Sequence, residues 1–296
     1  MAVAMVVDNW AARERMLVGI PVTERRLRVA GALTTVLEGG DGPSLVLLHG
    51  GIECGGPVWA PVISGLAETH RLIIPDLPGL GESEPVALLD AAAFAEWFAG
   101  LIRETCPEEP TLVAHSLAGS LAARFAAEHG ALLRRLVICA APAIGPYRMP
   151  LRLRVVATRF ALRPSERNAE RFDRFALLDL DRTREKDPGW FEGFTGYTIS
   201  RAVVPHVKRT MQQLLETCTK QIPDPELRRI AIPTTLVWGR HDRMVPVSLA
   251  EGASARLGWP LQVIDGAAHA PQIEQPDAFV NALLDAGGRR SSSEHR

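Results

Sequence analysis

The 296-residue sequence has few cysteines and no long uninterrupted apolar run, and each shortage excludes a class of protein. Its cysteines are far apart and form no C-x-x-C pair, so we expect reduced thiols, not a disulfide framework or a zinc site. No run of about 18 apolar residues is present to span a membrane. Met1–Val7 is too short for a signal-peptide core, so we expect a cytoplasmic protein. The four cysteines are Cys54, Cys106, Cys139 and Cys218.

The sequence also has little net charge, and it lacks the motifs of nucleic-acid, phosphate and metal binding. A net charge of −1 gives no overall attraction to nucleic acid. Gly79-Leu80-Gly81 continues into Glu82-Ser83, without the third glycine or the Lys-Ser/Thr of a phosphate-binding loop. No cluster of His, Cys and carboxylates has the spacing of metal ligands. We therefore expect no cofactor, no metal and a small-molecule partner, while the oligomeric state stays open.

Enough apolar sequence is present for a large core, and it is arranged as short strands that alternate with helices. Hydrophobic residues make up 47% of the chain. Continuous apolar strands that alternate with helices are typical of a parallel sheet covered on both faces. The strands follow a hairpin at residues 22–38, and the pattern predicts an eight-stranded, mostly parallel α/β sheet. The expected strands after the hairpin are 45–48, 71–74, 111–114, 135–139, 234–238 and 261–264, and the expected helices of this region are 59–67, 91–105, 117–128, 248–257 and 276–286.

The alternation stops between the sixth and seventh strands. Residues 142–222 contain helix-like stretches near 150–163, 166–179 and 200–220 but no convincing buried strand. We interpret this region as a helical cap inserted into a core formed by residues 21–141 and 223–286. Residues 1–20 would be an N-terminal extension with a short helix at 8–17, and residues 287–296 a disordered tail.

Ser116 is the strongest candidate for a catalytic residue. It follows the apolar strand Leu112–His115 and precedes small residues and a helix, where a strand-turn-helix elbow would present a nucleophilic hydroxyl. Such a strained turn requires small residues two positions before and after the serine, and these are Ala114 and Ala118. The alternative is that Ser116 only caps the following helix.

The loop after the strand at 45–48 could complete such a site. It reads His49-Gly50-Gly51-Ile52. An oxyanion hole needs one backbone N–H from this position and one from the residue after the nucleophile. Gly51, or Ile52 beside it, would supply the first and Leu117 the second, and an ordinary strand-end turn is the less favoured alternative. We expect His49, Gly50 and His115 to orient these loops or to contact substrate.

An acid and a base follow Ser116 in one chain order. Asp242 comes after the strand at 234–238 through Gly239, and the alternative position after Ile138-Cys139 offers no carboxylate. His269 lies in a loop after the last strand, and it alone of eight histidines follows the acid within an expected ordered loop. Asp242 would orient the imidazole and His269 would move the proton. For Asp242, surface capping is the alternative.

On these residues the sequence strongly resembles the α/β-hydrolase superfamily over roughly residues 30–285. The resemblance implies the α/β-hydrolase fold, a helical cap over the site, hydrolysis without a cofactor, and a loop at Asp76–Ser83 that borders the active site. The serine at the elbow argues against the haloalkane dehalogenases and epoxide hydrolases, which have an aspartate there. The matching segments are His49–Gly51, Asp76–Ser83, the Ser116 elbow, Gly239–Pro246 and His269–Pro271.

Some positions depart from the relatives or stay unassigned. Carbon–carbon bond hydrolases of ring cleavage usually carry Trp after the catalytic His and Asn before the Ser, whereas this sequence has Ala270 and His115. Glu53 is unusual in a small and apolar segment, and a solvated charge at the rim is favoured over a substrate-facing group. The cap from Arg148 to Lys220 has an excess of six positive charges, for which salt bridges between interleaved charges on its helices are favoured over attraction of an anionic acyl substrate or a membrane surface.

The sequence therefore predicts a serine hydrolase that cleaves an ester, thioester or lactone of a moderately hydrophobic small molecule through an acyl-enzyme on Ser116. Three other enzymes on the same scaffold stay possible: a carbon–carbon bond hydrolase, a lyase and a cofactor-free perhydrolase. A ligand-binding receptor with an idle triad is the more distant alternative. Substrate identity and acyl length are not encoded in any motif that we recognise.

Overall fold

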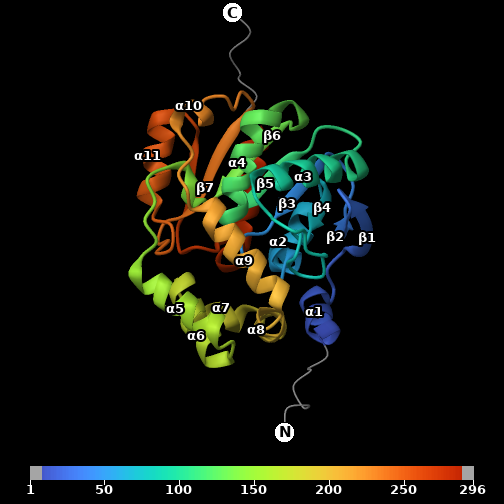
Figure 1. Ribbon diagram of the computed structural model, residues 1–296, viewed down its shortest axis with the longest axis vertical. Coiled ribbons are helices and arrows are strands. Elements are labelled where there is room, and N and C mark those ends of the chain that lie inside the picture. Colours follow the sequence, from blue (N-terminus) through green and yellow to red (C-terminus); the bar gives the residue numbers. More distant parts are fainter. Residues whose placement is uncertain (1–8, 289–296) are drawn as a thin grey trace, which may run out of the picture.

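The computed structural model describes residues 9–288 and is organised around one eight-stranded sheet (Figure 1). The strand order is β1-β2-β4-β3-β5-β6-β7-β8. The hairpin β1–β2 pairs antiparallel, β2 pairs antiparallel with β4, and all other neighbours are parallel. The strands are β1 (Thr23–Val29), β2 (Ala32–Gly39), β3 (Ser44–Leu48), β4 (Arg71–Pro75), β5 (Thr111–His115), β6 (Arg135–Cys139), β7 (Thr234–Gly239) and β8 (Leu261–Ile264).

Helices cover both faces of the sheet, and the central strands are apolar on both sides for that reason. In β3, Val46 and Leu48 join the core layer on one face, while Leu45 and Leu47 join the layer on the other. The first layer includes side chains of α3 (Ala91–Thr105), α4 (Leu117–His129), α9 (Pro205–Cys218), α10 (Asp224–Leu227) and α11 (Val247–Leu257). The second includes those of α1 (Asn9–Leu17), α2 (Ala60–Ala67), α8 (Pro188–Ala202), α12 (Pro271–Glu274) and α13 (Pro276–Gly288).

Six α-helices lie between β6 and β7, and we call the first five of them, α5 to α9, the cap. They are grouped beyond one end of the sheet, and α9 runs from them back along the core (Figure 1). The cap is not isolated, because α8 packs against α1 and contributes Phe191, Phe194 and Tyr197 to the second core layer. The remaining cap helices are α5 (Leu151–Leu162), α6 (Glu166–Ala176) and α7 (Leu180–Lys186), and short 3-10 turns lie at Gly56–Trp59, Gly130–Leu132 and Pro142–Ile144.

The fold class expected from the sequence is confirmed, including the helical insertion after the sixth strand. The helices expected near 150–163 and 166–179 correspond to α5 and α6. The expected helix at 200–220 is instead the end of α8 followed by α9, because Val203 and Val204 separate two helices and Pro205 starts the second. The helices α7, α10 and α12 were not expected. Most of the predicted C-terminal tail lies outside the described residues.

Two observations concern the features that are scarce in the sequence, long apolar helices and cysteines. Within residues 9–288, no helix is both long and apolar enough to cross a membrane. The four cysteines carry free thiols, and three of them are buried.

Candidate active site

The loops that carry the predicted catalytic residues meet at one edge of the sheet. Leu48 of β3 pairs with Ala114 of β5, so the loops that begin at His49 and Ser116 start side by side. Gly239 of β7 pairs with Ile264 of β8 in the same way, which aligns the loops that carry Asp242 and His269. The carboxyl ends of parallel strands are the usual position of active sites in such sheets.

Ser116 occupies a strained turn between β5 and α4. Its backbone has φ 55° and ψ −123°, a conformation that non-glycine residues rarely adopt. Ala114 and Ala118 are fully buried on either side of the turn. Gly119 lies against the next strand, since a Cβ there would be 2.8 Å from the Ala141 Cβ. The Ser116 side chain makes no capping hydrogen bond to α4, so its hydroxyl serves another partner.

That partner is His269. Its Nε2 lies 3.0 Å from the Ser116 Oγ, and its Nδ1 lies 2.8 Å from the Asp242 Oδ2. The other carboxylate oxygen of Asp242 accepts the N–H groups of Met244 and Val245, both at 2.8 Å. Asp242 and His269 are each only 6% exposed. The structure therefore brings together three side chains from three loops, with the imidazole between the hydroxyl and the carboxylate.

The glycine loop after β3 lies directly against the residue that follows Ser116. A Cβ on Gly51 would be 2.6 Å from the Leu117 Cδ1, so the loop and the Leu117 side chain are in close contact. The N–H of Ile52 already donates to the Gly50 carbonyl at 2.8 Å. Among the described residues, no acceptor lies within hydrogen-bonding distance of the Gly51 or Leu117 N–H. Of the two expected donors from this loop, Gly51 is therefore the one that is available to a ligand.

The two histidines beside the site hold the loops in place. His49 is fully buried; its Nδ1–H donates to the Gly50 carbonyl and its Nε2 accepts the Leu77 N–H. His115 Nε2–H donates to the carbonyl of His269 at 2.8 Å. Burial and the neighbouring His269 lower the pKa of His115 to about 3, so it stays neutral. His115 lines the cavity described below, whereas His49 faces the loop at Leu77.

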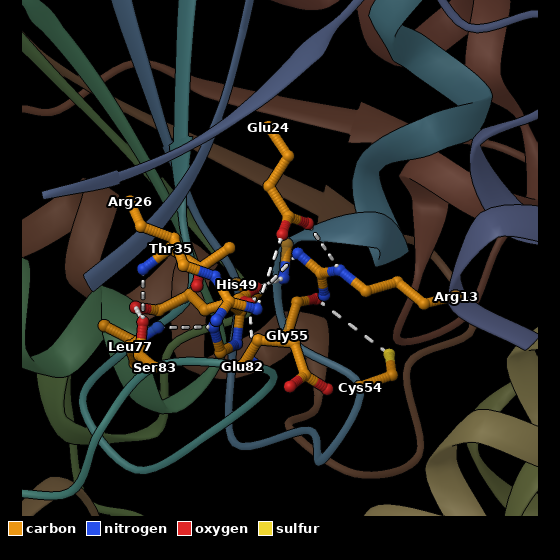
Figure 2. A network of polar contacts seen from close by, with 12 residues as sticks. Arg13, Glu24, Arg26, Thr35, His49, Cys54, Gly55, Leu77, Glu82 and Ser83 are labelled. Atoms are coloured by element: carbon orange, nitrogen blue, oxygen red, sulfur yellow. Dashed lines mark hydrogen bonds and ion pairs between the residues drawn. The ribbon is translucent and has the colours of Figure 1, made fainter. Parts of the chain in front are cut away.

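Behind the glycine loop lies a buried polar cluster, which we call the Arg13–Asp76 network (Figure 2). Arg13 of α1 reaches Asp76 Oδ2 at 3.1 Å and Glu24 Oε2 at 2.8 Å. Asp76 also accepts the N–H groups of Gly56 and Glu82. The loop at 76–83, which was expected to border the site, thus supports it from behind through His49 and Asp76.

A cavity of about 200 Å³ lies between the core and the cap and opens onto Ser116 and His269. Apolar side chains from the cap form most of its wall. Glu53, for which the sequence offered a solvated rim position or a substrate-facing one, also lines it, and burial raises the pKa of Glu53 to about 7. The cap residues in the wall are Ala157, Phe160, Ala161, Ala169, Phe172, Asp173, Ala176, Leu177, Phe191, Phe194, Thr195, Thr198, Met211 and Leu215.

Sequence reasoning missed how the cap is attached to the histidine loop. The carbonyl of Ala176, at the end of α6, accepts the His269 N–H at 3.0 Å. The buried carboxylate of Glu274 accepts the N–H groups of Leu178 and Ala268, and thereby joins cap and loop. In the sequence, the only local signal of this arrangement was Pro271, which lies shortly after His269. Within residues 9–288, no group of three His, Cys or carboxylate side chains is placed to hold a metal ion.

The family model described as the alpha/beta hydrolase family matches residues 45–282. The chain belongs to this family. This hydrolase is 29% identical over 267 residues to the pimeloyl-[acyl-carrier protein] methyl ester esterase of Vibrio vulnificus, with 84% of this chain and 96% of the relative covered. It is an enzyme, and its relatives include esterases.

Solved structures share the fold of this hydrolase. A carboxylesterase of Bacillus subtilis superposes with a TM-score of 0.78 at 23% identity, over 95% of this chain and 97% of that one. A 2-hydroxy-6-oxo-6-phenylhexa-2,4-dienoate hydrolase of Rhodococcus superposes with a TM-score of 0.77 at 24% identity, over 90% and 99%. The fold therefore accommodates both ester and carbon–carbon bond hydrolases, and the reaction has to be argued from the site.

Proposed function

We propose that this hydrolase cleaves a carboxylic ester of a small, moderately hydrophobic molecule through an acyl-enzyme on Ser116. The observation that carries the proposal is the position of His269, whose two ring nitrogens lie 3.0 Å from the Ser116 Oγ and 2.8 Å from the Asp242 Oδ2. The apolar wall of the cavity and the esterase among the relatives support an ester with a hydrocarbon segment next to its carbonyl.

In the first step, the Ser116 Oγ attacks the ester carbonyl carbon while the hydroxyl proton moves to His269 Nε2. Asp242 accepts the Nδ1–H and stabilises the imidazolium that forms. The N–H groups of Gly51 and Leu117 hold the negative oxygen, and a donor of this kind contributes about 10²–10³ in turnover. The proton then passes to the leaving alcohol as its C–O bond breaks.

In the second step, a water molecule attacks the acyl carbon, gives its proton to His269 and releases the acid. Ser116 recovers its proton from the imidazolium, so the enzyme returns to its starting state. His115 places no second positive charge beside the imidazolium, because burial keeps its ring neutral while its Nε2–H donates to the His269 carbonyl. His115 is thus proposed to position the catalytic histidine through its backbone.

Labelling with a fluorophosphonate, followed by identification of the modified peptide, tests the nucleophile. We expect modification of Ser116 and none in the Ser116→Ala variant, which should lose about 10⁴-fold or more in kcat on p-nitrophenyl esters. Ser120, buried on the same helix and bonded to the Ala143 N–H, provides a matched control in Ser120→Ala. Hydrolysis of a vinylogous diketone with no turnover of esters would overturn the proposal in favour of carbon–carbon bond cleavage.

A further inference from the structure

Two polar side chains in the wall of the catalytic cavity have buried atoms without hydrogen-bond partners in the described part of the chain, and a third, acidic side chain lines the same cavity. Asp173 of α6 is 7% exposed, and its Oδ2 has no hydrogen-bond partner. Gln272 of α12 is fully buried, and both its Nε2 and its Oε1 lack partners. Glu53, from the loop after β3, lines the same cavity. We call Glu53, Asp173 and Gln272 the acid subsite.

Within residues 9–288, Asp173 has no ion pair, although a cation lies close enough to influence it. Burial raises its pKa to about 7, Arg184 of α7 opposes this shift, and Glu53 and Glu170 add to it. The guanidinium of Arg184 lies 3.9 Å from Glu170 and 5.1 Å from the ring centre of Phe191, and it makes no ion pair with Asp173. Among the described residues, the wall of the cavity itself contains two acids, Glu53 and Asp173, and no lysine or arginine.

Such an arrangement is costly for the protein alone. Most buried polar atoms in folded proteins have partners, and a missing one costs about 1–3 kcal/mol. Asp173 and Gln272 point to a ligand because they leave three such atoms unpaired in a cavity that also contains Ser116. The apolar remainder of the wall accommodates a hydrocarbon segment between the reacting carbonyl and this polar group.

We propose that the acid subsite binds a basic nitrogen of the substrate, so that the preferred ester carries an amino group separated from its carbonyl by a hydrocarbon segment. The proposal rests on the proposed function, because it names the substrate class of the same site. An ammonium group donates three hydrogen bonds, which suit the two carboxylates and the Gln272 Oε1. Charge-assisted bonds of this kind are about twice as strong as neutral ones. A carboxylate at the same position would meet like charges.

Three methyl esters of matched shape test this proposal: methyl 6-aminohexanoate, methyl heptanoate and monomethyl pimelate, each with shorter and longer homologues. We expect the amino ester to exceed the alkyl ester in kcat/KM by about tenfold or more at the best length, and the carboxylate ester to be the poorest. The amino-to-alkyl ratio should rise between pH 6 and pH 8, as Glu53 and Asp173 ionise. This ratio cancels any titration that affects both substrates equally.

Two variants connect the preference to the subsite. Asp173→Asn and Glu53→Gln should each lower the amino-to-alkyl ratio by about tenfold. Glu166→Gln on the same helix as Asp173 removes an exposed acid outside the cavity and should leave the ratio unchanged. An equal ratio in the wild type and the Asp173→Asn variant would overturn the proposal, even where all three esters are hydrolysed.

Binding to the Ser116→Ala variant decides the matter independently of turnover. Calorimetry should show that methyl 6-aminohexanoate binds this variant about tenfold more tightly than methyl heptanoate, and that Asp173→Asn added to it removes the difference. Equal affinities would refute the acid subsite. By contrast, failure of all esters to react, together with no labelling of Ser116, would refute the proposed function while leaving a measured amino preference in binding intact.

Discussion

This hydrolase buries carboxyl groups on two sides of its glycine loop, and the two sides differ in the polar partners that these groups have. In the Arg13–Asp76 network, the fully buried Asp76 has a guanidinium at 3.1 Å and two backbone N–H donors at 2.6 and 2.8 Å. In the acid subsite, the almost equally buried Asp173 has neither, and its Oδ2 is unpaired. The two regions are close together along the chain, because Glu53 of the acid subsite and Gly56, which donates to Asp76, belong to the same loop.

The difference teaches that burial of a carboxyl group does not by itself mark a ligand site; a carboxylate oxygen that faces a cavity without a partner is the stronger sign. Around Asp76, even the backbone is adapted to the carboxylate, since a Cβ on Gly81 would be 2.3 Å from the Asp76 Cγ. Gly81 also has φ +50°, which favours glycine. Nothing comparable surrounds Asp173. The first region therefore stabilises the fold, and the second sacrifices stability for a ligand, as functional sites often do.

The largest effect should come from breaking the paired region. Asp76→Asn removes the charge that compensates Arg13, a side chain that is 2% exposed, and it weakens the acceptor for Gly56. Breaking a buried pair in this way typically costs about 3–5 kcal/mol, and we expect that fall in the free energy of unfolding by urea. The double variant Arg13→Met/Asp76→Asn should recover part of it. A loss below about 1 kcal/mol would mean that the network contributes little.

The second prediction concerns pH. Because burial raises the pKa of Asp173 to about 7, the folded protein retains a proton that the unfolded chain releases at lower pH. The stability that this proton contributes is present at acidic pH and is lost as the pH rises through about 7. The wild type should therefore lose stability relative to Asp173→Asn between pH 5 and pH 8, by on the order of a few kcal/mol. Urea unfolding at both pH values measures the difference.

Glu166→Gln is the control for that experiment, since its carboxyl is exposed on the same helix. It should follow the wild type across the whole range. A difference between wild type and Asp173→Asn that does not change with pH would contradict the raised pKa.

The third prediction is a gain in the free energy of unfolding, whereas the first is a loss. Asp173→Leu at pH 7 replaces an unpaired carboxyl by an apolar side chain in an apolar wall, and it should raise the free energy of unfolding by about 1–2 kcal/mol. The same variant should lose the preference for amino esters. If Asp173→Leu instead destabilises the protein as much as Asp76→Asn does, Asp173 has a structural role, and the contrast between the two regions fails.

The convergence of Ser116, Asp242 and His269 was predictable from the sequence because its signals are local. Ser116, Asp242 and His269 each follow a short apolar strand, and parallel strands bring their carboxyl ends to one edge. The eight strands were predictable for the same reason. The position of each side chain thus followed from its place in the strand order, which requires no knowledge of packing.

The rest depends on packing between distant segments. Helix α8 contains three glycines, which lower helix propensity, yet Gly193 lets α1 approach so closely that a Cβ would lie 2.9 Å from the Ala12 carbonyl. Arg13 and Asp173 gave no signal, because an isolated charge on a helix usually faces solvent. Their burial is decided by what the cap and α1 pack against, and no local pattern records that.

The smallest predicted effect tests the link between the paired region and the cap. The Tyr197 hydroxyl of α8 donates to Glu82 Oε1 at 2.5 Å, and Arg201 Nη1 lies 3.9 Å from the same oxygen. Glu82→Gln keeps an acceptor but removes its charge, so we expect a loss of about 1 kcal/mol in the free energy of unfolding. A double-mutant cycle with Tyr197→Phe should give a coupling of similar size. Strict additivity would show that this hydrogen bond does not couple the network to the cap, and the network would then end at Glu82.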